Sequence, residues 1–363
     1  MLIQCTKALR EEMEIKDEDL AAADKPRDRS DLLTGWHANV IMIGDRPAVL
    51  LMNDESRYPI VIGEVEDEDF SEMPDLMAEA IREVLRMEGV REDVLERYMS
   101  EGGGLVISKA SDQRWIGKMN RAAVDVEFEG SYIEENRKIQ RPLSMKAARM
   151  IQSEGEQDAF FPAERMVECL GRMYDTAEVL DVELYQLHIE LPLKKHNVWR
   201  RVYVPATFTF EHLHQVIQVV FEWKDSHLHQ FFAGRNGQEP MTIVMDGALD
   251  MLDVMDTGKS EVRLEHITPL KDILPDYTDI TYQYDFGDDW QHTITFEKTL
   301  SAVARRAVYV EGHGDSPPED IEAERGLESY VMALIKEQEP DAAYTFLNER
   351  LRKIPTAYTL ALL

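Results

Sequence analysis

The chain has 363 residues, of which 44% are hydrophobic, and its 70 Asp and Glu against 40 Lys and Arg give a formal net charge of −30. The length favours two domains over one, and the hydrophobic share excludes a wholly disordered chain. The acidic charge is spread along the chain and disfavours duplex DNA as a partner, because phosphate binding needs a basic surface.

Cysteine usage and hydropathy narrow the class of protein further. The two cysteines, Cys5 and Cys169, lie far apart, which excludes a disulfide framework and fits a reducing compartment. No apolar run approaches the roughly 18 residues typical of a membrane span, and the first residues lack the pattern of a signal peptide. We therefore expect a cytoplasmic protein that does not contact a membrane.

The first half mixes short apolar segments with amphipathic ones. Residues 38–44 and 47–53 flank Asp45-Arg46 and predict a β-hairpin of buried strands. Further strands are expected at 58–63 and 105–109, and helices at 73–87, 91–99, 112–126 and 162–174. We expect an α+β domain over residues 1–155, followed by a helical linker over 156–180.

The second half, residues 181–363, opens with alternating apolar residues that predict a strand over 182–191, paired with a second strand over 198–204. Thr209 is suited to cap a helix whose apolar stripe recurs at helical spacing: Leu213, Val216, Ile217 and Val220. Strands are expected at 227–233, 280–286 and 290–296, and helices near 327–336 and 341–353. Ser316 to Glu319 has the pattern of a capping box. The mixture predicts two α+β domains, each with a mixed or largely antiparallel sheet and packed helices.

Three segments of the second half identify a resemblance. They are F-E-W-K-D-S-H-L-H-Q-F (221–231), Y-Q-Y-D-F-G-D-D-W-Q-H-T-I-T-F-E-K (282–298) and P-P-E-D (317–320). In this order and spacing they resemble the plasmid pRiA4b open-reading-frame-three-like family. The resemblance implies a compact α+β domain carried on plasmids and insertion elements, and it implies no established activity.

The first half resembles a second, uncharacterised small domain family. The segments that carry this resemblance are C-T-K (5–7), W-H-A-N (36–39), L-L-M-N-D-E-S-R-Y (50–58) and V-I-S-K-A-S-D-Q-R-W-I-G-K-M-N (106–120). Within them Trp36-His37 and Arg114-Trp115 are polar aromatic pairs of the kind that line a groove. The same residue pairs are also expected if the tryptophans are buried in the core, and we prefer this interpretation to a groove.

The segment Y-D-F-G-D-D-W-Q-H (284–292) is a candidate acid–base or metal site within a hairpin. A three-residue loop at 287–289, or a longer loop of the same parity, places the apolar faces of the two strands together. The three-residue loop pairs Phe286 with Trp290 and Tyr284 with His292. His292 then faces the core as a hydrogen-bonded histidine, while Asp288 and Asp289 shape the turn. The alternative is a working site, for which the candidates are Asp285, Asp288, Asp289 and His292, beside a candidate groove of Trp223, Tyr284 and Trp290.

His227 and His229 are the candidate metal ligands. Two apart on an expected strand, they share one face, and with Asp288 they suit zinc or manganese; Asp225 and Asp289 are alternative carboxylates. Such a site activates water for hydrolysis. The competing interpretation, which we favour, is a pair of strand histidines bonded to the backbone. His212 and His214, two apart on a helix, diverge by about 200° and are not expected to share an ion.

Three functions remain open on the sequence alone. The preferred one is a two-domain module that acts mainly by binding a protein or a small molecule. The second is a metal-dependent hydrolase that uses the His-x-His and Asp-Phe-Gly-Asp-Asp segments. The third is an accessory to mobile-element or nucleic-acid processing, which the family's genetic setting suggests and the net charge of −30 opposes.

Overall fold

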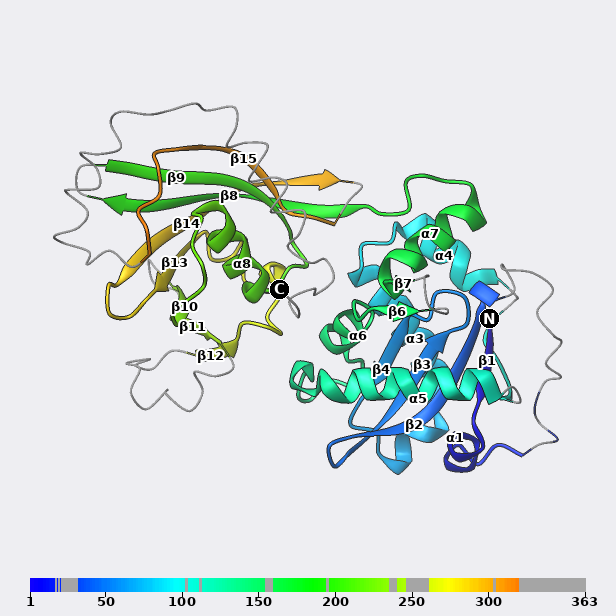
Figure 1. The fold of residues 1–363 in the computed structure, drawn as a ribbon. Helices are drawn as coiled ribbons and strands as arrows, with labels where there is room; N and C mark the ends of the chain where they lie inside the picture. The colour runs from blue at the N-terminus through cyan, green and yellow to red at the C-terminus, as the bar shows by residue number, and fades with distance from the viewer. Residues whose placement is uncertain are drawn as a thin grey trace. The chain divides into compact units, whose positions relative to one another are not determined.

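The computed structural model describes residues 1–16, 18, 20, 32–101, 104–110, 113–153, 159–193, 196–234, 240–245, 261–302 and 305–319. The chain divides into two compact units, and the division falls between Asp181 and Val182. Each unit has its own hydrophobic core and its own sheet. The predicted two α+β domains are confirmed (Figure 1).

The first unit is built on a five-stranded mixed sheet in the order β4-β3-β2-β1-β5. Strand β1 pairs in parallel with β2 and β5, whereas β2, β3 and β4 form an antiparallel meander. The predicted hairpin is confirmed, with a turn at Gly44-Asp45 and Gly44 at φ +63°, where glycine is unstrained. The strands are β1 (Leu2–Cys5), β2 (Gly35–Ile43), β3 (Arg46–Asn53), β4 (Pro59–Ile62) and β5 (Val106–Lys109).

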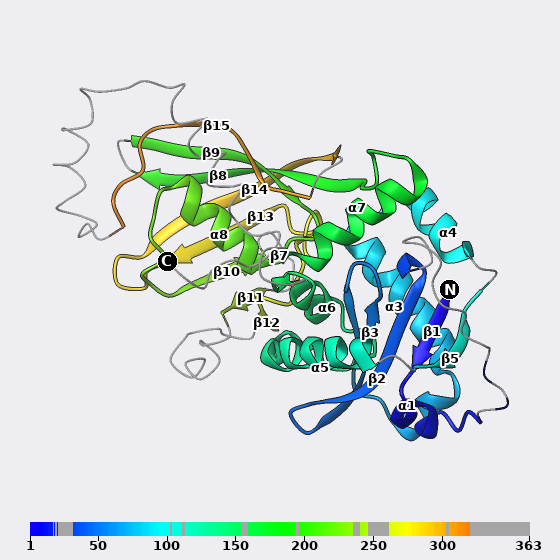
Figure 2. The same cartoon turned by 45° about the vertical axis from the view of Figure 1, so that its right-hand side comes forward.

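Helices cover both faces of this sheet. Helix α5 lies across β2 and β3, as Figures 1 and 2 show from two directions. The opposite face buries Trp36 and Leu51 in the core that includes α3, α4 and α7. Helix α7, which lies in the segment expected to be a linker, places Met166 and Leu170 in that core. The helices are α1 (Lys7–Glu12), α3 (Met73–Met87), α4 (Glu92–Ser100), α5 (Gln113–Phe128), α6 (Arg141–Ala147) and α7 (Pro162–Tyr174). Short elements complete the unit: η2 (Asp67–Ser71), η4 (Gly130–Tyr132), β6 (Gln152–Ser153) and β7 (Ala159–Phe160).

The second unit is built on an eight-stranded sheet in the order β12-β11-β10-β13-β14-β8-β9-β15. All neighbours are antiparallel except β11 and β12. The strands are β8 (Val182–Leu193), β9 (His196–Pro205), β10 (His229–Ala233), β11 (Met241–Val244), β12 (Glu261–Leu264), β13 (Asp279–Tyr284), β14 (Trp290–Ala302) and β15 (Val308–His313). A short helical turn, η6 (Leu270–Asp272), precedes β13.

Helix α8 (Phe210–Val220) packs on one face of this sheet. Thr209 caps it as predicted, since its hydroxyl accepts a hydrogen bond from the His212 amide. The predicted apolar stripe is fully buried, at 0% exposure for Leu213, Val216, Ile217 and Val220. In the part of the chain that is described, no helix is long and apolar enough to cross a membrane.

The β13–β14 hairpin corrects one predicted register and confirms its alternative. Tyr284 pairs with Trp290 and Tyr282 with His292, so the loop has five residues instead of three and the same parity. The predicted pairs Phe286–Trp290 and Tyr284–His292 are therefore wrong. Asp285 and Asp289, both at φ 53°, close the wider loop, and the left-handed region is one that aspartate tolerates better than most residues.

Two further predictions at the end of the chain have different outcomes. The helices near 327–336 and 341–353 lie outside the described residues. Glu319, predicted to complete a capping box, instead accepts hydrogen bonds from the Lys224 amide and the Tyr284 hydroxyl.

Candidate metal centre in the second unit

His229 is the first residue of β10, and its imidazole is oriented by a buried carboxylate. Its Nε2 lies 2.7 Å from Oε2 of Glu265, and both side chains are less than 10% exposed. Because a carboxylate only accepts, Nε2 carries the proton and donates it. Nδ1 then presents a lone pair, and this buried atom meets no hydrogen-bond partner among the described residues.

His214 lies on the inner face of α8, directly against His229. The two rings are parallel within 1°, and their centroids are 3.5 Å apart. Nδ1 of His214 lies 2.8 Å from the Tyr282 hydroxyl, and Nε2 lies 2.9 Å from Oδ1 of Asp225. Burial lowers the pKa of His214, and repulsion from His229 adds to this effect. The imidazole is therefore neutral at pH 7, which is the form that binds metals.

Asp225 lies on the segment between α8 and β10, at φ 60°. Its amide donates to Oε1 of Gln218, and the Gln218 side-chain amide donates to the Tyr282 hydroxyl. The carboxyl side chain remains 56% exposed, while His214 beside it is 4% exposed. Hydrogen bonding to His214 lowers the pKa of Asp225, against the opposing effect of burial, which is the largest single influence. Asp225 is thus an ionised group between the buried histidines and solvent.

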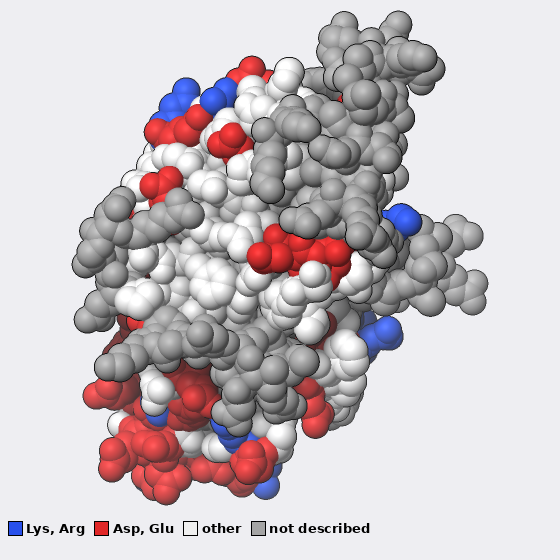
Figure 3. Space-filling view, turned by 90° about the vertical axis from the view of Figure 1, so that its left-hand side faces the viewer, with Lys and Arg blue, Asp and Glu red and all other residues white. Residues whose placement is uncertain are grey.

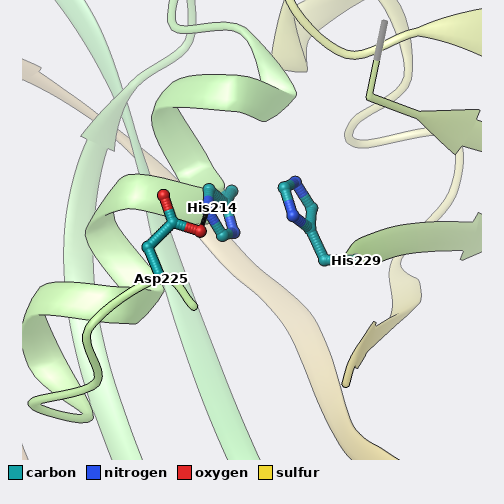
Figure 4. Close-up of side chains that lie close together, drawn as sticks. All are labelled: His214, Asp225 and His229. Carbon is teal, nitrogen blue, oxygen red and sulfur yellow. Dashed lines mark hydrogen bonds and ion pairs between the residues drawn. The ribbon is translucent and has the colours of Figure 1, made fainter. Parts of the chain in front are cut away.

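These three side chains form a cluster with the composition of a metal site. One ligand atom from each of His214, Asp225 and His229 lies within 4.8 Å of the other two. Figure 4 shows His214 between Asp225 and His229, with the two imidazole rings face to face. Two imidazoles and a carboxylate, with a water as fourth ligand, are a common zinc ligand set.

The cluster must contract before it can hold an ion. Tetrahedral zinc with bonds of about 2.0–2.1 Å requires ligand atoms roughly 3.3 Å apart, whereas those of the cluster are separated by up to 4.8 Å. Parallel stacked rings also cannot direct their in-plane lone pairs to one point. Binding therefore requires one ring to turn and Asp225 to move inward.

The other predicted ligands lie apart from this cluster. Strand β10 begins at His229, so His227 precedes the strand and does not share its face by strand alternation. Its Nε2 lies 3.5 Å from Oδ2 of Asp285. Asp285 also accepts hydrogen bonds from the amides of Gly287 and Asp288, and therefore shapes the hairpin loop. Asp289 accepts hydrogen bonds from the side chains of Gln283 and Gln291.

His292 faces the core, as predicted. It is 0% exposed, and the polar contact of its ring is with the Tyr282 backbone, a weak one because neither ring nitrogen reaches ordinary hydrogen-bond geometry. Its ring packs edge-on against Phe221 and Trp223, at centroid distances of 4.6 and 5.1 Å. Burial lowers the pKa of His292 to about 3. The side chain is a neutral core residue and takes no part in the cluster.

The candidate groove of Trp223, Tyr284 and Trp290 contacts the chain's own P-P-E segment. The indole nitrogens of Trp223 and Trp290 donate to the carbonyls of Pro317 and Glu319, at 2.7 and 3.2 Å. The Tyr284 hydroxyl donates to Glu319 at 2.8 Å. Because these polar atoms are satisfied within the chain, the three aromatics anchor this segment.

His214 and Glu265 are the residues of the site that sequence reasoning missed. His214 was set aside because its neighbour His212 points elsewhere on the helix, and indeed His212 bonds Thr209. The apolar stripe of α8 could have identified His214, because this histidine lies on the same inner face of the helix. Glu265 has no motif, and only the pairing of β11 with β12 brings it near His229.

Comparisons with known proteins divide the chain in the same way as the structure. Residues 183–353 match the model of plasmid pRiA4b ORF-3-like protein. The second half of the chain belongs to the plasmid pRiA4b ORF-3-like family. Residues 2–165 match a domain of unknown function (DUF6933). Both predicted resemblances are confirmed, and the cluster of His214, Asp225 and His229 lies within the ORF-3-like half.

Individual relatives carry no stated activity. The uncharacterized protein y4hQ of Sinorhizobium fredii is 32% identical over 157 residues, which are 41% of this chain and 72% of that protein. The crystal structure of a protein of unknown function, MM3350 from Methanosarcina mazei Go1, is 26% identical with a TM-score of 0.36. That match covers 46% of this chain and 89% of the other. The functional argument for the ORF-3-like unit therefore rests on its side chains.

Proposed function

We propose that the ORF-3-like unit is a metal-binding module that holds one zinc ion through His214, His229 and Asp225. The observation that carries the proposal is Nδ1 of His229, a buried lone pair without a partner on a ring whose other nitrogen donates to Glu265. A carboxylate on the far nitrogen is the usual arrangement behind a metal-binding histidine, because it fixes the tautomer and raises the basicity of the ligand.

The ligand types favour zinc over manganese, the other ion considered from the sequence. Imidazole nitrogens suit zinc, copper, iron and nickel, whereas manganese prefers sites made mostly of oxygen. Two of the three protein ligands are imidazoles. Tyr282 supports the set because its hydroxyl lies 2.8 Å from Nδ1 of His214. When Nε2 of His214 binds the ion, Nδ1 keeps the proton and donates it to this hydroxyl.

Three protein ligands leave a fourth position for water or for an oxygen of a bound molecule. Zinc at such a position lowers the pKa of bound water and polarises carbonyl or phosphoryl oxygens. Asp225 is the exposed member of the set, so this position faces solvent on its side. Zinc binding is thus compatible with two functions expected from the sequence, the binding module and the metal-dependent hydrolase. Both functions would require the ion to be bound.

Surface charge gives no support to the nucleic-acid alternative. On the face drawn in Figure 3, acidic side chains gather in groups, and few basic ones lie among them. Together with the net charge of −30, this disfavours a partner whose affinity depends on phosphate contacts.

Elemental analysis of the full chain, purified without chelator or histidine tag, tests the proposal. We expect about one equivalent of zinc, restored after removal by a chelator and lost in His229→Ala. His227→Ala is the matched control, since this histidine lies two residues away and outside the cluster, and it should keep the metal. Zinc retained by His229→Ala and lost from His227→Ala would refute the assignment, and so would an absence of binding when zinc is added back.

A further inference from the structure

The first unit contains a second buried histidine that a carboxylate orients. Nδ1 of His37, on β2, lies 2.6 Å from Oδ1 of Asp54, which follows β3. His37 is 0% exposed and Asp54 is 4% exposed. The Gln4 side chain donates to the other carboxylate oxygen at 3.2 Å. Burial raises the pKa of Asp54, while the hydrogen bond to His37 opposes that effect.

The far nitrogen of His37 has no partner. With Nδ1 donating to Asp54, Nε2 presents a lone pair, and no described residue donates to it. Burying an unpaired acceptor destabilises a fold. His37 differs from the core residue His292 in lying under side chains that are only partly buried, so a group from outside the chain is a candidate partner for its Nε2. The arrangement repeats that of His229 and Glu265 in the second unit, although here no cluster of metal-binding groups surrounds the histidine among the described residues.

Residues from four separate segments of the sequence meet around the carboxylate–histidine pair. Strand β1 supplies Gln4, β2 supplies His37, the end of β3 supplies Asp54, and α5 supplies Trp115 above the sheet. Three of these residues fall within the segments that carry the resemblance of the first half to its family.

Trp115 and Lys118 cover His37 from the first turns of α5. The Trp115 ring stacks on His37 with centroids 5.5 Å apart and an interplanar angle of 24°. The Lys118 ammonium lies 4.0 Å from the centre of the Trp115 ring. Both side chains are only partly buried. A flat ring and a cation therefore stand between the buried histidine and the solvent.

We propose that His37, Asp54, Trp115 and Lys118 form a binding site for a small planar anion that carries a hydroxyl group or a ring N–H. The donor of the ligand bonds Nε2 of His37 at the edge of the imidazole, its ring packs beside Trp115, and its negative charge pairs with Lys118. Aromatic faces and cations recognise this combination of shape and charge, and Asp54 holds the tautomer that leaves Nε2 as acceptor.

Ring-nitrogen NMR of the full chain with ¹⁵N-labelled histidine tests this site. His37→Gln assigns the signal, and in the free protein we expect Nε2 to be unprotonated. The probe is 4-hydroxybenzoate; benzoate lacks the donor, and 4-hydroxybenzyl alcohol lacks the charge. We expect a saturable shift of the His37 signal with 4-hydroxybenzoate and at least about tenfold weaker binding of either comparison probe.

Variants separate this site from unspecific binding. Lys118→Met should weaken the binding of 4-hydroxybenzoate by about tenfold but leave the binding of 4-hydroxybenzyl alcohol unchanged. His188→Gln is the matched control, because this histidine also packs on a tryptophan, Trp199, at 5.0 Å. A proton on Nε2 in the free protein would overturn the proposal. So would no shift with any probe at about 10 mM, or equal affinity for all three.

Discussion

His292 shows how a titratable side chain can serve as a core residue. It is fully buried between aromatic rings, and its ring nitrogens make no hydrogen bond of ordinary geometry in the described chain. The charged form would need a solvation that this core does not supply, so burial keeps the ring neutral. The neutral form is in turn tolerated because an imidazole packs edge-on against aromatic faces.

This burial predicts a loss of stability in acid. The pKa of His292 is lowered to about 3 in the folded chain, and it returns to about 6.5 on unfolding. The unfolded state therefore binds the proton first, and stability falls as the pH drops from about 6.5 toward 3. Between pH 7 and pH 4, protonation of His292 in the unfolded state should lower the free energy of unfolding by about 3 kcal/mol. Urea unfolding of the full chain at both pH values measures the difference.

A substitution isolates the contribution of this one side chain. His292→Phe keeps a ring in the core and removes the proton site, so its stability should depend less on pH over the same range. His313→Gln, at an exposed position on β15, should behave as the parent. An unchanged acid sensitivity in His292→Phe would show that other groups cause it.

Residue roles were only partly predictable from the sequence. Strand parity placed His292 on the core face, because a one-residue shift would have exposed a row of apolar side chains. His229 was a candidate ligand because it and His227 were expected to share one face of a strand. Strand β10 begins only at His229, so His227 lies outside it. Asp225 was among the alternative carboxylates, but His214 comes from α8, and sequence spacing does not reveal that this helix meets the start of β10.

At the scale of elements, the P-P-E segment holds the loop that carries Asp225. Glu319 is 3% exposed and accepts hydrogen bonds from the Lys224 amide at 2.9 Å and the Ser226 hydroxyl at 3.2 Å. Through the Tyr284 hydroxyl it also reaches the amide of Ser226. The loop on both sides of Asp225 is therefore fixed to a segment more than 90 residues away.

Glu319→Gln should weaken zinc binding without removing a ligand. The Lys224 amide and the Ser226 hydroxyl both donate to Glu319 and therefore need acceptor atoms. Glutamine replaces one of the two acceptor oxygens by a donating NH₂ group, so part of the contacts on both sides of Asp225 is lost. Supporting residues of metal sites change affinity by about 10–100-fold, and we expect a decrease at the lower end of this range. Competition with a chromophoric chelator measures it.

The matched control is Asp315→Asn, a nearby acid that is only partly buried. It should bind zinc as the parent does. A Glu319→Gln protein that is folded, by near-ultraviolet circular dichroism, and has parental affinity would show that the loop needs no support from this carboxylate.

Elements with a strong period were predictable, whereas several short ones were not. The stripe of α8 and the alternation of β8 were confirmed because each has one face in the core. Strands β1, β11 and β12, of four residues each, were missed, whereas the equally short β4 and β5 were predicted because glycines flank their apolar runs. Strand β15 was also missed, since its second half is exposed. These short strands extend the sheets and therefore depend on partners that the local sequence does not contain.

At the scale of the whole molecule, two separate cores predict two independently folding units. Helix α7 decides where the first one ends, because it contributes buried Met166, Cys169 and Leu170. We propose residues 1–181 as the folding unit, in place of the 1–155 expected from the sequence. The free energy of unfolding of the 1–155 fragment should be about 5 kcal/mol lower than that of residues 1–181. The reason is that three buried side chains of this kind each stabilise the fold by roughly 1.5–3 kcal/mol.

Urea unfolding of the two fragments tests this boundary. Residues 1–181 should unfold in one cooperative transition, with Trp36 reporting through its hydrogen bond to Tyr98. Equal stability of the 1–155 fragment would place α7 outside the first unit, as a linker.

X-ray absorption at the zinc edge of the loaded full chain tests the central claim most directly, because it reports the ligands of the ion. The account predicts two imidazole nitrogens and additional oxygen ligands at about 2.0–2.2 Å, with one imidazole fewer in His214→Ala. A first shell that contains sulfur, or oxygen without imidazole, would contradict the assignment of His214 and His229 as zinc ligands.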